Sequence, residues 1–257
     1  MNELAKNKRE PLLTEDFFDE EISIGRENLT QNAYYLQHRY SEVVKPEILL
    51  FSNFSERYAL LSLEYSRGQH IETIRGEFVD LVNSLEHYKH HPAAENFFFN
   101  GEQDEYMQAV TLLSVALLLH VEADVFRRLT DVIGAAGQDY VLEWLVSRRL
   151  PERPPTTTKL LFPKTYARLR DALQAPPDLQ PQLLRSFLAG WYESLNTVWY
   201  NIHAHRPDAA GFTGYWCWEA AAAAYCLGLD DTELQTMRYY PKDLADYAFG
   251  RKPAPVA

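Results

Sequence analysis

Hydrophobic residues recur along most of this chain at intervals of three and four positions, the spacing that places them on one face of an α-helix. The first long segment shows the pattern clearly. Thr14 suits the N-cap position of this predicted helix, and Pro46 ends or interrupts it. Its apolar face carries Phe18, Ile22, Leu29, Ala33, Leu36, Tyr40 and Val43.

The opposite face of the same helix is polar. At about 100° per residue, a second stripe runs along the side facing away from the apolar residues. We expect this stripe to be exposed, and acidic at its N-terminal end. It consists of Asp16, Glu20, Glu27, Gln31 and His38.

The helical spacing continues to the end of the chain, and loops rich in proline separate the later segments. Gly68 and Gly228 fit the positions just past two helix ends, and Pro181 fits the first turn of another helix. No segment alternates like a strand, so the predicted fold class is all-α, with an acidic N-terminal part packed on a C-terminal part rich in Trp and Tyr. The further helices are predicted over residues 47–67, 71–85, 107–121, 123–133, 139–149, 164–173, 181–202 and 215–227.

The chain is acidic, and the charge is unevenly distributed. It has 257 residues and a formal net charge of −11. Residues 1–125 contain 22 acidic and 10 basic side chains, whereas residues 126–257 contain 14 and 15. This balance argues against direct binding to nucleic acid or to an anionic membrane, because both require basic patches. It leaves two readings open, a solvated acidic surface or a face directed at a basic partner.

Cysteine usage and hydropathy point to a cytoplasmic protein. Cys217 and Cys226 would lie roughly 13 Å apart on one straight helix, too far for a disulfide. The N-terminus is too polar for a signal peptide. The most apolar stretch, Val110–Val121, is shorter than the ~20 residues of a membrane span, and we interpret it as a buried core helix.

Candidate catalytic and metal-binding residues are few. No glycine pattern for nucleotides and no nucleophile elbow is present. His203 and His205 lack further ligands at recognisable spacing, and a structural or solvated role is favoured for both. The histidines 87, 90 and 91 are typical of a helix end, where cationic imidazoles suit the helix dipole.

Three acidic residues near the C-terminus allow two interpretations. Asp230, Asp231 and Glu233 could hold a metal together with carboxylates such as Glu20 and Glu21, as in a helical metal-dependent hydrolase. Because they follow Gly228 directly, we favour capping of the next helix by Asp230 or Asp231.

Glu219 stands alone in an apolar helix. If it is buried, it must be paired or hydrogen-bonded, and we interpret it as a structural anchor. A raised pKa could serve catalysis, but no nucleophile or base is placed beside it.

Several short motifs occur in the C-terminal half of the chain. They are 160–164 (LLFPK), Trp191–Tyr192, Trp199–Tyr200 with His203, 214–222 (GYWCWEAAA), 227–231 (LGLDD) and 239–244 (YYPKDL). Together they resemble the C-terminal domain of the PoNe immunity protein (PoNi) family, with Trp218 as one departure, and Tyr65–Gly68 resembles the N-terminal domain of that family. The similarity covers nearly the whole chain from about residue 9 and is more specific in the C-terminal half.

The resemblance implies a non-enzymatic antitoxin with two helical domains, here residues 9–125 and 126–250, followed by a tail at 251–257. It implies protection against a PoNe-type DNase of the PD-(D/E)xK class, delivered by type VI secretion or a related contact-dependent system. No catalytic residue, metal or cofactor is carried over. The motif residues that we interpret as structural are Trp191, Tyr192, Trp199, Tyr200, Tyr215, Trp216, Glu219, Asp230, Asp231, Tyr240, Pro241 and Asp243.

The charge pattern independently favours such a partner. A DNase needs a basic groove for its substrate, and an acidic face can compete for that groove. We therefore expect Asp16, Glu20 and Glu27 to contact the toxin. Tight binding also needs desolvated aromatic anchors, and the sequence alone does not show which of the 16 tyrosines are exposed. A scaffold for another basic partner remains a further alternative.

Overall fold

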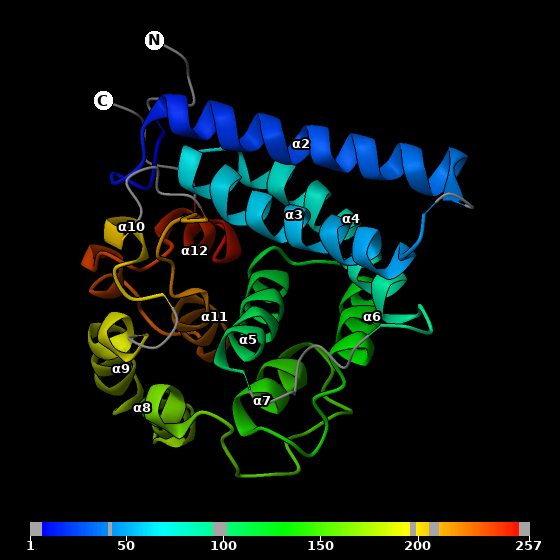
Figure 1. Cartoon of the computed structure of the whole chain (residues 1–257). Coiled ribbons are helices and arrows are strands. Elements are labelled where there is room, and N and C mark those ends of the chain that lie inside the picture. The colour runs from blue at the N-terminus through cyan, green and yellow to red at the C-terminus, as the bar shows by residue number, and fades with distance from the viewer. Residues whose placement is uncertain (1–6, 41–42, 95–101, 196–198, 206–210, 252–257) are drawn as a thin grey trace. The chain divides into compact units, whose positions relative to one another are not determined.

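The computed structural model describes residues 7–251 apart from 41–42, 95–101, 196–198 and 206–210. Over these residues the regular elements are helices and no strand occurs, which confirms the all-α class (Figure 1). The elements are α2 (Glu15–His38), α3 (Pro46–Arg67), α4 (Ile71–Lys89), α5 (Gln103–Leu118), α6 (Ala123–Ile133), α7 (Tyr140–Arg149), α8 (Pro163–Gln174), α9 (Gln180–Ser194), α10 (Ile202–His205), α11 (Trp218–Leu227), a 3-10 turn (Leu234–Thr236) and α12 (Lys242–Ala248).

Two predicted helices were too long. Helix α2 ends at His38, because the chain must reverse before α3 begins at Pro46. Tyr40 therefore leaves the apolar stripe, and its side chain is 51% exposed. The helix predicted over 181–202 ends at Ser194, and Val198, assigned to its stripe, lies outside the described residues.

The last strong helix was predicted to begin too early. Helix α11 begins at Trp218 rather than Tyr215. The physical reason is a tertiary contact, since the Cys217 N–H donates to the carbonyl of Tyr239 at 2.8 Å and the preceding residues are not helical. Both cysteines are free thiols.

The chain divides into two compact units. Unit 1 comprises residues 1–97 and 202–214, and unit 2 comprises residues 98–201 and 215–257. Counted this way, unit 1 has 18 acidic and 11 basic side chains and unit 2 has 18 and 14. These compact units do not coincide with the two domains expected at residues 9–125 and 126–250. The expected domain limits stay a prediction.

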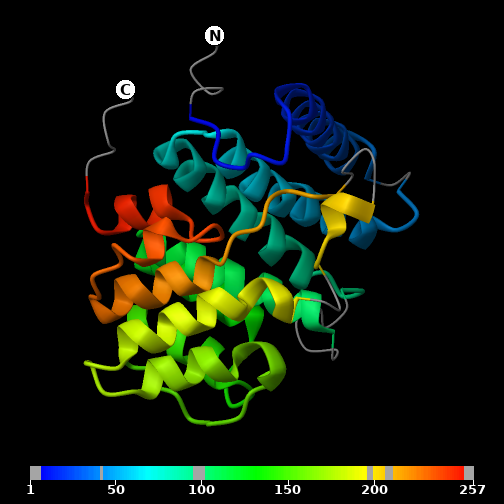
Figure 2. The ribbon, with the colours of Figure 1, turned by 90° about the vertical axis from the view of Figure 1, so that its left-hand side faces the viewer.

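In unit 1, α3 lies between α2 and α4 (Figures 1 and 2). Helix α2 buries Phe18 and Ile22 from its predicted apolar stripe. Gly25 lies where α2 approaches α3 closely, because a Cβ there would come within 3.3 Å of the Leu60 side chain. The segment at 202–214 joins this unit through Ser66, whose hydroxyl donates to the Thr213 carbonyl at 2.6 Å.

Unit 2 is built around α5. Its residues from Ala109 to Leu118 are buried, as expected of a core helix. Helix α11 packs against it, and the small side chains of Ala220–Ala224 are almost fully buried, which suits a close approach of two helices. No helix in the described ranges combines the length and apolar character that crossing a membrane requires.

Trp216 provides a test of this core. It lies in the extended segment before α11, rather than on the helix as the sequence suggested, and is only 8% exposed. Trp216→Ala should lower the free energy of unfolding by about 3 kcal/mol or more, because truncating a buried aromatic leaves a cavity. Urea unfolding measures the loss.

Tyr200→Ala is the control for that substitution, because the Tyr200 side chain is exposed and its truncation should cost much less. Equal losses for the two variants, or an unchanged stability for Trp216→Ala, would show that Trp216 does not belong to the core.

Candidate functional site

Helix α2 presents three acidic side chains to solvent, and we call Asp16, Glu20 and Glu27 the acidic stripe. All three are exposed, as the helical periodicity predicted. The start of the helix is held by Thr14, whose hydroxyl accepts from the Phe17 N–H at 3.2 Å. Within the part of the chain that the structure describes, none of the three carboxylates has an ion-pair or side-chain hydrogen-bond partner. Their charge is therefore available to a partner.

Several other acidic residues of unit 1 pair with an arginine of a neighbouring helix. Arg26 of α2 donates to Glu64 at 2.5 Å and to Glu77 at 2.9 Å, and these two hydrogen bonds raise the pKa of its guanidinium. Asp80 lies 3.8 Å from Arg57. Asp19, next to Glu20 in sequence, pairs with Arg67. These carboxylates link helices, whereas the acidic stripe does not.

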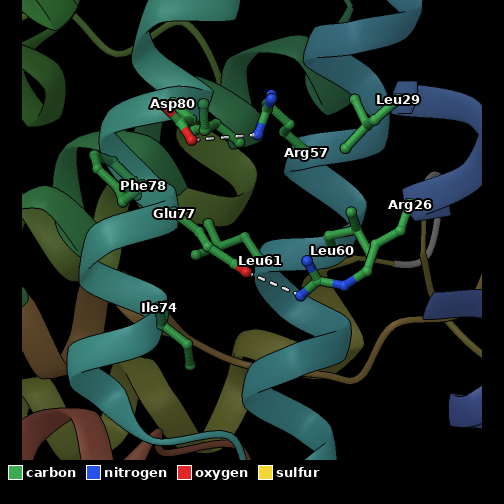
Figure 3. Close-up of a pocket in the computed structure, with 10 residues that line it drawn as sticks. Arg26, Leu29, Arg57, Leu60, Leu61, Ile74, Glu77, Phe78 and Asp80 are labelled. Carbon is green, nitrogen blue, oxygen red and sulfur yellow. Dashed lines mark hydrogen bonds and ion pairs between the residues drawn. The ribbon is translucent and has the colours of Figure 1, made fainter. Parts of the chain in front are cut away.

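The ion pairs of Arg26 and Arg57 border a small cavity between α2, α3 and α4 (Figure 3). Its volume is about 130 Å³, and Leu60, Leu61 and Ile74 contribute to its lining. Ligand pockets usually measure about 300–1,000 Å³. Because the cavity is small and its arginines are paired with carboxylates of the same unit, we assign it to helix packing.

Glu219, in the first turn of α11, is buried and has the hydrogen bond that burial requires. Its Oε1 accepts from Trp191 Nε1 of α9 at 2.8 Å. Burial raises the pKa of Glu219 to about 7, while hydrogen bonds from Trp191 and Cys217 oppose the rise. The same burial raises the pKa of the Cys217 thiol well above its usual value, so this thiol is protonated at neutral pH. The hydrogen bond between Trp191 and Glu219 links α9 to α11.

Asp231 has a different role from the predicted one. It was expected, with Asp230, to be a cap for the next helix, but the 3-10 turn at Leu234–Thr236 has no side-chain cap. Asp230 instead closes a local turn through the N–H and hydroxyl of Thr232. Asp231 is fully buried and accepts hydrogen bonds from donors that are far away in sequence.

These donors to Asp231 come from both sides of α12. The Tyr240 hydroxyl donates at 2.7 Å, and two guanidinium nitrogens of Arg251 donate at 2.6 and 2.8 Å. Burial disfavours the ionised carboxylate, but the hydrogen bonds from Arg251 and Tyr240 hold the pKa of Asp231 below its usual range. Asp231 therefore links the segment before α12 to the segment after it.

Several of the aromatic motif residues converge on Tyr192. Its ring lies 4.8 Å from Tyr200, 4.9 Å from Tyr215 and 4.8 Å from Tyr239, and its hydroxyl donates to Asn201 Oδ1 at 2.9 Å. Trp191 joins this cluster through Tyr239, whose ring lies 5.7 Å from its own. The structure places Trp216 against Trp218, Trp199 half-buried in a turn, Pro241 buried before α12 and Asp243 exposed in its first turn.

The histidine candidates are dispersed. His203 is half-buried on α10 with its ring 5.6 Å from that of Phe212, and the side chain of His205 lies outside the described residues. The histidines 87, 90 and 91 stand at the end of α4, as predicted. In the described ranges, no group of three or more His, Cys, Asp or Glu side chains is arranged to hold a metal ion.

Two further buried carboxylates were not recognised from the sequence. Asp139 caps α7 through the N–H groups of Val141 and Leu142, and it also accepts from the Tyr106 hydroxyl at 2.9 Å and the Leu161 N–H at 2.8 Å. Glu143 accepts from the N–H groups of Thr156 and Thr157 and so holds the proline-rich loop between α7 and α8. These hydrogen bonds outweigh the effect of burial and lower the pKa of Glu143. The sequence showed only that Asp139 stands where a helix begins.

Two family profiles match this chain, and together they cover most of it. Residues 9–131 match the profile of the PoNe immunity protein (PoNi), N-terminal, and residues 137–244 match that of the PoNe immunity proteins (PoNi), C-terminal. No curated protein matches the chain. The crystal structure of protein PA2201 from Pseudomonas aeruginosa is similar over 96% of this chain and 93% of that one, with a TM-score of 0.75 and 18% identity. That likeness concerns the fold alone.

The structure and these comparisons define first a class, an all-helical protein with a PoNi-like arrangement of N-terminal and C-terminal parts. The chain belongs to the PoNe immunity protein (PoNi) family. Membership implies an immunity protein that acts against a PoNe nuclease toxin and suggests a role without catalysis.

The buried Glu219 should make folding stability depend on pH. The pKa of Glu219 is about 7 in the folded chain, against an ordinary value of 4.5 for an exposed glutamate, so the folded chain holds this proton more tightly than the unfolded chain does. The free energy of unfolding should fall as the pH rises from about 4.5 to 7, by on the order of 3 kcal/mol. Glu219→Gln keeps an acceptor for Trp191 without a charge, and should remove this fall. Urea unfolding at pH 5 and pH 8 measures it.

Glu193→Gln on α9 is the matched control, because Glu193 is exposed and should leave the pH dependence as it is in the wild type. If Glu219→Gln also leaves the difference between pH 5 and pH 8 unchanged, the carboxyl is ionised in the folded chain throughout this range.

Proposed function

We propose that this protein neutralises a PoNe-type DNase by binding it directly through the acidic stripe of α2. The supporting observation is that Asp16, Glu20 and Glu27 are exposed and have no charged partner within the described chain, while neighbouring carboxylates are paired with arginines. Family membership supplies the class of partner.

The physical basis is competition for a basic groove. A nuclease must attract a polyanion, so the surface that holds DNA carries Lys and Arg. An acidic helix is attracted to the same surface, and electrostatic steering can bring association to about 10⁸–10⁹ M⁻¹s⁻¹ at low salt. Fast capture matters because each free nuclease molecule can cut the chromosome.

We further propose that the protein acts in the cytoplasm, where chromosomal DNA lies, against a toxin delivered by type VI secretion or a related contact-dependent system. In this role it takes part in competition between bacteria. It would bind protein and not nucleic acid, because its net charge of −11 disfavours a polyanionic ligand.

The direct experiment is a DNA-cleavage assay. A PoNe-type nuclease domain, taken from the neighbouring reading frame where that frame encodes one, is mixed with plasmid DNA and increasing amounts of this protein. We expect cleavage to stop near one molar equivalent, with a complex visible by size-exclusion chromatography. Undiminished cleavage at a large excess, or DNA hydrolysis by this protein alone that a chelator abolishes, would contradict the proposal.

Charge reversal tests the role of the acidic stripe. Changing Asp16, Glu20 and Glu27 to lysine shifts the net charge from −11 to −5 and touches no buried residue. We expect normal melting, because surface substitutions usually change stability by less than about 0.5 kcal/mol. Association with the nuclease should slow about tenfold or more at low salt, with a flatter salt dependence. Stopped-flow fluorescence measures both.

A second triple variant, with Asp104, Asp178 and Glu193 changed to lysine, gives the same charge change on unit 2. These residues are also exposed, without an ion-pair partner in the described chain. Asp104, like Asp16, lies in the first turn of its helix. If the two variants associate equally fast, only net charge matters and the acidic stripe is not the contact.

A further inference from the structure

The exposed face of α2 carries apolar side chains as well as carboxylates. Ile24 follows Glu20 by four residues and Tyr34 follows Glu27 by seven, so both lie on the same face as the acidic stripe. The structure leaves Ile24 46% and Tyr34 49% exposed. The opposite face of the helix supplies the apolar contacts to unit 1 through Phe18 and Ile22. The outer pair therefore has no evident packing role in unit 1.

Single exposed apolar residues are common on protein surfaces, but this pair has a particular setting. Ile24 lies between Glu20 and Glu27, whose charge is uncompensated in the described chain, and Tyr34 lies two turns beyond Glu27 on the same face. The end of α2 also leads into a region with more exposed apolar side chains, where α3 begins. These side chains are Tyr40, Val44 and Ile48.

The ring of Tyr34 is held in place by its neighbours. It lies 5.2 Å from the ring of His38 and 5.9 Å from that of Tyr35, and the Arg39 guanidinium stands 5.8 Å from its centre. A side chain that is already ordered loses little rotamer entropy when it is buried by a partner. Tyrosine is also among the residues that carry most of the energy at protein interfaces.

We infer that Ile24 and Tyr34 are the side chains that anchor this protein in its complex with the nuclease, while the acidic stripe attracts and orients the partner. The inference rests on the proposed function. The partner is a basic protein surface, because the three uncompensated carboxylates lie on the same face as the apolar pair and flank Ile24. The two anchors are ten positions apart, which corresponds to about 15 Å along the helix. The nuclease surface should therefore have two apolar hollows at this spacing along a basic groove.

The two kinds of contact predict different kinetics. Long-range charge acts mainly on the association rate, whereas desolvated anchors act mainly on the dissociation rate. Tyr34→Ala should therefore raise the dissociation rate at least tenfold and leave association within about twofold. Ile24→Ala should act in the same direction and less strongly. Neither variant should melt differently from wild type, because both side chains are about half exposed.

The experiment measures association and dissociation by surface plasmon resonance, with an inactivated form of the same PoNe-type nuclease domain immobilised. Tyr200→Ala is the matched control, because it removes an exposed tyrosine of unit 2 and should leave both rates unchanged. Light scattering of the free protein shows whether the same face joins two copies of this chain.

The outcomes separate this inference from the proposed function. If wild-type protein does not bind the nuclease, the proposed function fails and the inference fails with it. If wild type binds and Tyr34→Ala dissociates as slowly as wild type, the inference alone fails. A wild-type dimer that Tyr34→Ala dissociates, with nuclease binding unchanged, would also overturn it, because the face would then serve self-association.

Discussion

A carboxylate that leaves water needs donors, and this constraint determines which acidic residues of the chain support the fold. In unit 2, Asp139, Glu219 and Asp231 are buried, and donors from distant segments satisfy each of them. In unit 1, the buried Glu64 of α3 accepts from Arg26 of α2. The helices are therefore held in place by these polar contacts together with their apolar faces.

The same constraint shows which acidic residues the fold does not use, and these are the ones that we propose for recognition. Asp16, Glu20 and Glu27 stay in water on the outer face of α2, where a carboxylate needs no protein donor. An immunity protein must capture its toxin quickly and release it slowly. Long-range charge can give fast capture. It does not give slow release, because exposed ion pairs contribute little to the binding free energy. Ile24 and Tyr34, on the same face, would provide the second by being desolvated in the complex.

The sequence predicted what depends on local pattern and missed what depends on distant contacts. The spacing of apolar residues correctly predicted α6 at residues 123–133 and the exposure of the acidic stripe, because both follow from the helical period. The pairing of Asp231 was missed because Arg251 lies twenty residues further along the chain. The start of α11 was missed because Cys217 bonds to Tyr239. The exposure of Tyr34 also follows from the helical period, because this residue lies seven positions after Glu27, but it was not singled out from the sequence.

The most direct test of the central claim is hydroxyl-radical footprinting of the complex between this protein and its nuclease, because oxidation reports the exposure of each side chain. We predict that Ile24 and Tyr34 lose most of their reactivity on binding, while Leu161, Leu179 and Tyr200 of unit 2 keep theirs. Protection confined to those residues of unit 2, with Ile24 and Tyr34 oxidised as fast as in the free protein, would contradict the claim that the outer face of α2 binds the toxin.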